Sequence, residues 1–196
     1  IVYDVHGTEM GRLHGENRIL VTLSDISPHF INALLSREDH RFYDHGGIDY
    51  RGLVRALVRD LQDRSFTQGA STISMQLARN SFALTGKSLH RKALEIALAR
   101  RIESAHTKDQ VLELYVNRIF FGTGLYGVER ASQAYFGKSA RTMTLDEGAL
   151  LAAIIRGPNK FSPFRSPEVA RSGRDMVLRR MVEQERLRPD EAEAAM

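Results

Sequence analysis

The chain has 196 residues, which is enough for one domain with a sizeable core or one domain built from two lobes. Its 42% hydrophobic and 27% charged residues are typical of a globular protein, and the absence of cysteine excludes disulfides and thiolate metal sites. The formal net charge is +4, and 23 of the 28 basic residues are Arg, which suits bidentate contact with phosphate or carboxylate but is also enriched by a GC-rich genome.

The longest apolar run, residues 149–155, is far shorter than the roughly 18 residues that span a bilayer, so the chain as given is predicted to have no transmembrane segment. The sequence begins at Ile1 and shows no signal peptide. We therefore expect a fragment or processed form whose membrane anchor lies upstream.

The first 23 residues are predicted to form a short β element or linker. IVYDV at 1–5 and RILVTL at 18–23 have the composition of strands, and the turn formers Asp4 and Gly7 precede the second of them. From residue 24 onward the signals are helical. Ser27 is a predicted N-cap with Pro28 at the first helical position.

Apolar residues at helical spacing predict further helices around residues 53–61, 94–102, 111–119, 149–155 and 177–181. Capping boxes at Thr107–Gln110 and Thr144–Glu147 mark the start of two of them. Ser166 followed by Pro167 marks the start of the last. We find neither an internal repeat nor a low-complexity tract, and we predict a mostly α domain, 24–196, behind the small β element 1–23.

The first candidate site is SREDHRFYDHGG, residues 36–47. Glu38 and Asp39 lie at the end of the helix that starts at Pro28, where the helix dipole disfavours a carboxylate. Partial burial beside Phe42 would suit Glu38 to general-base chemistry. The alternative is that both acids are solvated and pair with neighbouring Arg residues, and the segment by itself leaves both interpretations open.

Two further stretches have the composition of an anion site. In TQGASTISMQLARN, residues 67–80, a small-residue turn precedes a helix, so N–H groups and hydroxyls could bind an anion, or could simply cap the helix. In the second stretch, Arg91, Lys92 and Glu95 share one helix face. That face could hold a diphosphate, or it could be an ordinary surface ion pair.

These stretches, followed by KDQVLELYVN and by ASQAYFGKS and LDEGALLAAIIRGPNKFSP, occur in an order that resembles the peptidoglycan glycosyltransferases. This is the glycosyltransferase family 51 domain of class A penicillin-binding proteins and monofunctional transglycosylases. The resemblance covers about residues 18–182. It implies a mainly α, lysozyme-like, two-lobed helical fold, and it implies inverting polymerisation of lipid II into β-1,4 glycan strands at the outer, periplasmic face of the cytoplasmic membrane.

By the same resemblance, Glu38 matches the general base, and Glu95 matches a second acid that assists diphosphate departure or holds a water or cation. Matches to substrate-binding positions are Asp39, Phe42, His45, Gln68, Ser71, Thr72, Gln76, Arg79, Asn80, Arg91 and Lys92. Matches to positions expected to give structural support are Glu113, Tyr115 and Asn117. No cofactor is required and no metal ligand is assigned, although a divalent cation, Mg or Mn, is compatible with the family.

Two positions depart from the family pattern. Met75 stands where a Gln is usual, and it either contacts substrate or packs inward. Arg79 stands where Lys is common, which keeps the charge and changes the geometry. The membrane-facing part is expected around Phe66 and residues 81–86, where Phe82 and Leu84 enter the interface or belong to the core.

The expected partners are lipid II, the growing glycan chain, the membrane surface and a C-terminal transpeptidase domain, with no nucleic acid. A lysozyme-like hydrolase or lytic transglycosylase is the first alternative, but cleavage of an uncharged glycosidic bond needs no cationic face. A basic nucleic-acid-binding module is the second, suggested by a pI near 9.6 but lacking any binding motif.

Overall fold

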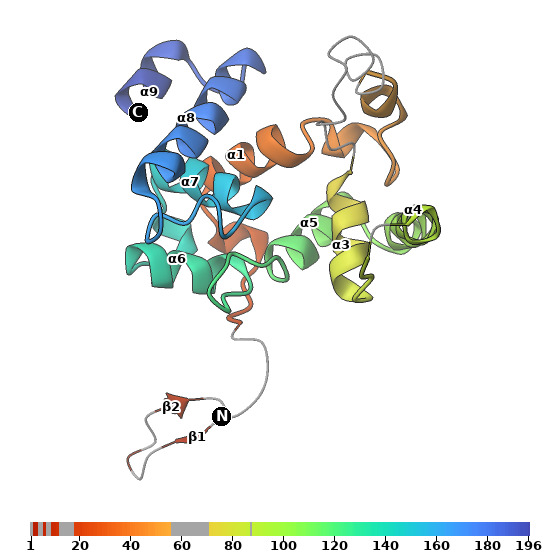
Figure 1. Ribbon diagram of the computed structural model, residues 1–196, viewed down its shortest axis with the longest axis horizontal. Coiled ribbons are helices and arrows are strands. Elements are labelled where there is room, and N and C mark those ends of the chain that lie inside the picture. Colours follow the sequence, from red (N-terminus) through yellow and green to blue (C-terminus); the bar gives the residue numbers. More distant parts are fainter. Residues whose placement is uncertain (1, 4–5, 7–8, 12–17, 56–70, 87) are drawn as a thin grey trace.

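The computed structural model describes residues 2–3, 6, 9–11, 18–55, 71–86 and 88–196 (Figure 1). The two strands are β1 (Val2–Tyr3) and β2 (Glu9–Gly11). The α-helices are α1 (Pro28–Glu38), α3 (Ile73–Ser81), α4 (Leu89–Ala105), α5 (Lys108–Val116), α6 (Val128–Phe136), α7 (Leu145–Arg156), α8 (Pro167–Glu183) and α9 (Pro189–Ala194). Short 3-10 helices are η1 (Leu23–Asp25), η2 (Phe42–Asp44) and η3 (Ala140–Thr142). The predicted mainly α class is confirmed.

The N-terminal β element exists, but its second strand is not the one predicted. β1 pairs antiparallel with β2, and the hairpin lies apart from the helices in Figure 1. The predicted strand over residues 18–23 is wrong. Val21 N donates to Asn117 Oδ1 at 3.0 Å and Asn117 Nδ2 donates to Val21 O at 2.8 Å, so a side-chain amide satisfies the groups that a neighbouring strand would otherwise satisfy.

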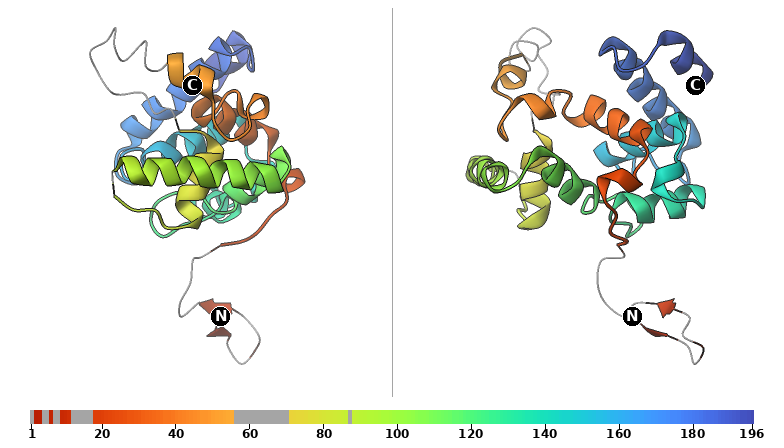
Figure 2. Two further views of the ribbon diagram at one scale, coloured as in Figure 1. Left: turned by 90° about the vertical axis from the view of Figure 1, so that its right-hand side faces the viewer. Right: turned by 180° about the vertical axis from the view of Figure 1, so that it is seen from behind.

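One group of helices is built around α7, which packs against both α1 and α8. Small side chains make this possible: Ala149, Ala152 and Ala153 of α7 are buried in one cluster with Ala33 of α1 and Val177 of α8. Gly148 makes the closest approach, because a Cβ at this position would lie 2.8 Å from the backbone N of Phe30. The layered arrangement of these helices is visible in Figure 2.

The second group consists of α3, α4 and α5, with α3 packed against both of the others. Residues 73–78 of α3 are all buried, whereas α4 buries only Glu95 and Ala99. One apolar cluster unites the two groups, since it contains Phe30 of α1, Ile73 of α3 and Leu112 of α5. Within the second group, α3 therefore lies between α4 and α5.

The predicted helix starts are largely found. Ser27 precedes α1, although its hydroxyl donates to Met143 O at 2.7 Å and accepts no hydrogen bond from the backbone N–H groups of the helix. The capping box of Thr107 and Gln110 forms with bonds of 2.9 and 3.3 Å. Most of the predicted helix at 53–61 lies outside the described residues. The part that is described lies within residues 50–55, which are helical. Helix α6 was not predicted.

Among the described residues, no helix is both long and apolar enough to cross a membrane.

Candidate active site

Glu38 is the last residue of α1, and its two carboxylate oxygens have different surroundings. Oε2 accepts a hydrogen bond from Gln76 Nε2 at 2.8 Å. Oε1 is buried and accepts no hydrogen bond from the residues that the structure describes. A buried carboxylate oxygen without a partner is costly in a folded protein, and such groups concentrate at functional positions.

Gln76 is in turn held from α5. The Tyr115 hydroxyl donates to Gln76 Oε1 at 3.1 Å, and the Tyr115 side chain is completely buried. Burial raises the pKa of Tyr115 well above its ordinary value of 10, and the negative charge of Glu38 adds to the effect. Tyr115 therefore keeps its proton and remains a donor. Side chains from α5, α3 and α1 thus form one hydrogen-bonded chain.

Asp39, the residue after α1, is directed at the start of α3. One of its oxygens accepts from Ile73 N at 3.0 Å, and His45 Nε2 lies 3.0 Å from the other. Phe42 is buried and contacts the His45 ring edge to face, with ring centroids 6.3 Å apart. Asp39, Phe42 and His45, all predicted to bind substrate, therefore make their described contacts within the protein.

The turn after His45 is fixed by a glycine and by Thr72. Gly47 has a φ of +91°, a conformation that favours glycine, and a Cβ there would lie 3.1 Å from Ala99 O of α4. Its carbonyl accepts from Thr72 Oγ1 at 2.7 Å, and the same hydroxyl accepts from Met75 N at 3.2 Å as the N-cap of α3. Thr72 thus connects the stretch 36–47 with the start of α3.

Glu95 is the second acid, and it is 1% exposed. Arg91 Nη1 lies 2.5 Å from Oε1, and Lys92 Nζ lies 3.3 Å from Oε2. Lys92 Nζ also donates to Ser71 Oγ at 2.7 Å. The surface ion pair considered from the sequence is excluded by this burial. Two cations face one carboxylate, so the cluster has one positive charge in excess and is suited to an anion.

Both acids are thus connected to α3 or to the residues just before it, through Gln76 and Ser71. On the same helix, Arg79 is half-buried and Asn80 is exposed. Met75 is completely buried, so of the two possibilities left by the sequence it packs inward. Gln68 lies outside the described residues.

The three residues expected to give structural support, from the stretch KDQVLELYVN, contact two different parts of the protein. Tyr115 holds Gln76, as described above, while Glu113 Oε2 accepts from Leu23 N at 3.0 Å and Asn117 pairs with Val21. Glu113 and Asn117 are one helical turn apart, so they hold the entering chain from one face of α5 while Tyr115 points toward α3.

Glu103 was missed by the sequence analysis. It accepts from Ser74 of α3 and from Lys108 Nζ, the latter at 2.8 Å, and Lys108 Nζ also lies 4.3 Å from the centroid of the Phe42 ring. The available signal was spacing: Glu103 follows Glu95 by eight residues, which places both acids on one face of a helix. This cluster fixes α4 against α3.

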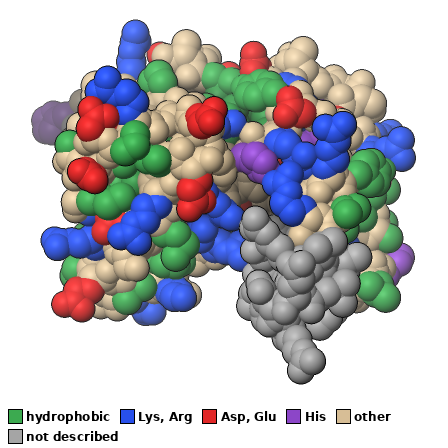
Figure 3. All heavy atoms as spheres, turned by 90° about the horizontal axis from the view of Figure 1, so that it is seen from above, with side chains coloured by type: hydrophobic (Ala, Val, Ile, Leu, Met, Phe, Trp, Pro, Cys, Tyr) green, Lys and Arg blue, Asp and Glu red, His purple; other side chains and the backbone are tan. Residues whose placement is uncertain are grey.

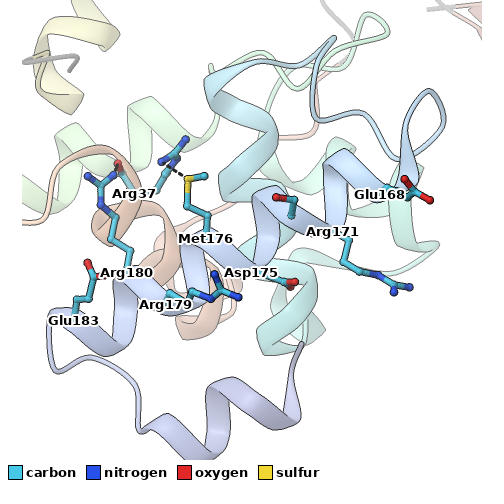
Figure 4. Close-up of a pocket in the computed structure, with 9 residues that line it drawn as sticks. Arg37, Glu168, Arg171, Asp175, Met176, Arg179, Arg180 and Glu183 are labelled. Carbon is cyan, nitrogen blue, oxygen red and sulfur yellow. Dashed lines mark hydrogen bonds between the residues drawn. The ribbon is translucent and has the colours of Figure 1, made fainter. Parts of the chain in front are cut away.

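The surface view from above, Figure 3, shows a hollow near the middle of the face with Lys and Arg side chains on both sides. A different pocket, of about 510 Å³, runs along α8, and only Arg37 of its lining comes from α1 (Figure 4). Its lining contains Arg residues and also the acids Glu168, Asp175 and Glu183. These opposite charges make the pocket less suited to binding an anion than the cations at Glu95. No group of three His, Asp or Glu suited to a metal occurs among the residues described.

Comparisons with known proteins show the family of the chain. The transglycosylase family matches residues 6–182. Penicillin-binding protein 1A of Aquifex aeolicus is 42% identical over 195 residues, which is all of this chain and 27% of that protein. Penicillin-binding protein 1A of Escherichia coli is 42% identical over 183 residues, 93% of this chain and 22% of that protein.

The crystal structure of penicillin-binding protein 1A from Haemophilus influenzae aligns with a TM-score of 0.57 and 25% identity over 98% of this chain and 19% of that one. The chain belongs to the transglycosylase family. It is a peptidoglycan glycosyltransferase domain of the penicillin-binding protein type, as the sequence predicted. The chain spans about a quarter of the length of these two penicillin-binding proteins.

Proposed function

We propose that this domain polymerises lipid II into β-1,4 glycan strands by an inverting transfer, with Glu38 as general base and Glu95 assisting departure of the lipid diphosphate. The observation that carries the proposal is the contrast between the two acids. Glu38 has a neutral hydrogen-bond donor and one buried oxygen without a partner in the described part of the chain, whereas Glu95 lies between two cations. One environment suits proton transfer and the other suits stabilisation of negative charge.

The proposed reaction gives each acid one role. The 4-hydroxyl of the acceptor sugar gives its proton to the Glu38 carboxylate as its oxygen forms a bond to the anomeric carbon of the donor. The bond from that carbon to the diphosphate oxygen breaks on the opposite face, so the configuration inverts without a covalent sugar–enzyme intermediate. The electron pair of the breaking bond stays on the diphosphate, and Arg91 and Lys92 meet the developing charge.

A divalent cation does not fit the described residues well. Arg91 and Lys92 already contact both oxygens of Glu95, the acid that would be its ligand. The charge of the diphosphate can be met by side chains, and we therefore propose a reaction that requires no cofactor. No step above depends on a metal ion.

We further propose that the complete protein acts at the outer face of the cytoplasmic membrane, held there by an N-terminal transmembrane anchor, and carries a transpeptidase domain after residue 196. The support is that the penicillin-binding proteins it resembles are much longer than this chain. The alternative of a peptidoglycan hydrolase is disfavoured by the two cations at Glu95, which an uncharged glycosidic bond does not need.

The test is polymerisation of labelled lipid II by the Glu38→Gln variant. We expect the rate to fall at least about 100-fold, as is typical when a general base is removed, while binding of a lipid-diphosphate ligand persists. Asp44→Asn, an exposed acid of the same motif, is the matched control and should retain the rate. Polymer formation at a normal rate by Glu38→Gln would refute the base assignment. Release of fragments from finished peptidoglycan would favour the hydrolase.

A further inference from the structure

The hydrogen-bonded chain from α5 to α1 has a direction that chemistry dictates. An ionised carboxylate only accepts hydrogen bonds, so Gln76 must present its NH₂ group to Glu38. The amide carbonyl then faces Tyr115, and the Tyr115 hydroxyl must be the donor. The orientation of the Gln76 amide is therefore set from α5.

Gln76 is 8% exposed, and both ends of its amide are occupied within the protein. Tyr115 has no exposed surface at all. These two side chains therefore have little surface left for a substrate, although the resemblance matched Gln76 to a substrate-binding position. Their hydrogen bonds lead instead to Glu38 Oε2, whereas Oε1 is the buried oxygen that has no partner among the described residues.

We propose that Tyr115 is a positioning residue for the transfer reaction: its hydroxyl fixes the Gln76 amide with the NH₂ group toward Glu38, and this hydrogen bond stabilises the carboxylate form that acts as the base. The proposal rests on the proposed role of Glu38 as base. Without the hydroxyl, the amide can turn its carbonyl toward Glu38, and two acceptors would then face each other.

Burial raises the pKa of Tyr115 well above its ordinary value, so this hydroxyl stays protonated and remains a donor near neutral pH. Charged groups also act on this hydrogen-bonded chain. Arg37 interacts electrostatically with Glu38, and both Asp39 and Arg79 of α3 act on the Tyr115 hydroxyl. In the described part of the chain, however, Gln76 supplies the hydrogen bond to the Glu38 carboxylate.

The first experiment measures lipid II polymerisation against pH for Tyr115→Phe in the complete protein that contains this chain. We expect kcat near neutral pH to fall about tenfold and KM for lipid II to stay within about twofold. The acidic limb of the profile should move up by about one pH unit, the size associated with a lost hydrogen bond to a charged group. Higher pH should then restore much of the rate.

Tyr135→Phe is the matched control. The Tyr135 hydroxyl donates to Phe121 O at 2.9 Å and makes no contact with Gln76 or Glu38, so its removal should leave the pH profile unchanged. A Tyr115→Phe profile that superimposes on the wild type would overturn the proposal. So would a loss of rate at every pH with an unmoved acidic limb, because that is the effect of a merely structural residue.

The second experiment needs no activity. Titration of the Glu38 carboxyl ¹³C resonance, assigned by its loss in Glu38→Gln, should show a higher midpoint in Tyr115→Phe than in the wild type. Gln76→Met should show a similar increase in the midpoint. The double variant should add little to it, because both substitutions remove the same hydrogen bond to Glu38. An unmoved midpoint in Gln76→Met overturns the proposal even if Tyr115→Phe does not fold. If the wild type makes no polymer, the proposed function fails, and this titration still decides the positioning role.

Discussion

At the scale of single residues, Glu38 and Glu95 differ in the charge of the groups that contact them, and this difference decides which of them can accept a proton. Glu38 receives one neutral hydrogen bond from the described residues, so a proton that it takes from a hydroxyl displaces no ion pair among them. Glu95 could take up a proton only by giving up contacts with Arg91 and Lys92. A group in that position serves better to organise cations than to accept a proton.

Glu95→Gln tests that division of work. The variant keeps the shape of the side chain but leaves Arg91 and Lys92 without a counter-charge, so we expect at least about a 100-fold loss in polymerisation rate. A diphosphate ligand should bind as tightly as before or more tightly, because both cations become available to it. Isothermal titration calorimetry with a lipid-diphosphate analogue measures this. Weaker binding at an unchanged rate would contradict the role in leaving-group departure.

The identity of most residues in the candidate site could be predicted from sequence motifs, but their partners could not. Whether Met75 faced substrate or core was open in the sequence, and packing of the completely buried side chain decides it. The pairing of Gln76 with Tyr115 joins residues 39 positions apart. Such contacts depend on how α3 and α5 pack, which local spacing does not specify.

At the scale of elements, the close crossing of α1 and α7 depends on Gly148, which has no side chain. A Cβ on Gly148 would lie 2.8 Å from Phe30 N and 2.9 Å from Phe30 Cα, and backbone atoms of a packed helix cannot move aside alone. Because α1 ends at Glu38, any separation of the two helices also displaces the candidate base.

Gly148→Ala should therefore destabilise the fold, although alanine is the better helix former. We expect a loss of about 1–2 kcal/mol in the free energy of unfolding, since overpacking outweighs the gain in helix propensity. Urea denaturation measures it. Gly46→Ala is the control: it has no atom within 4 Å of the added Cβ and should cause no loss. Equal stability of the Gly148 variant and the wild type would show that the crossing can relax.

The helices were easier to predict than the strands because their signals are local. Ser27 with Pro28 and Thr107 with Gln110 are found at helix starts, since a cap involves residues only three positions apart. The false strand at 18–23 arose because its hydrogen-bond partner, Asn117, follows Val21 by 96 residues. An extended segment and a strand have the same local composition, and only the distant partner distinguishes them.

At the scale of the whole molecule, the apolar side chains that remain exposed near α3 and α4 have a consistent location. Phe82, in the turn after α3, is 55% exposed, and Leu89, the first residue of α4, is 91% exposed. Leu84 between them is half-buried. Exposed aromatic and aliphatic groups on a chain of net charge +4 suit an anionic lipid surface. The other helix group has its own exposed aromatic, Phe164, in the loop between α7 and α8.

Phe82→Ser should weaken binding of this chain to vesicles that contain phosphatidylglycerol, whereas Phe164→Ser should not. Both changes remove one exposed Phe, of 55% and 69% exposure, so they lower the hydrophobicity of the surface about equally. Transfer of part of a Phe side chain into the interface predicts a three- to tenfold weaker association, on the order of 1 kcal/mol. Co-sedimentation with vesicles measures the difference. Equal effects of the two substitutions would mean that hydrophobicity in general, and not the turn after α3, determines membrane contact.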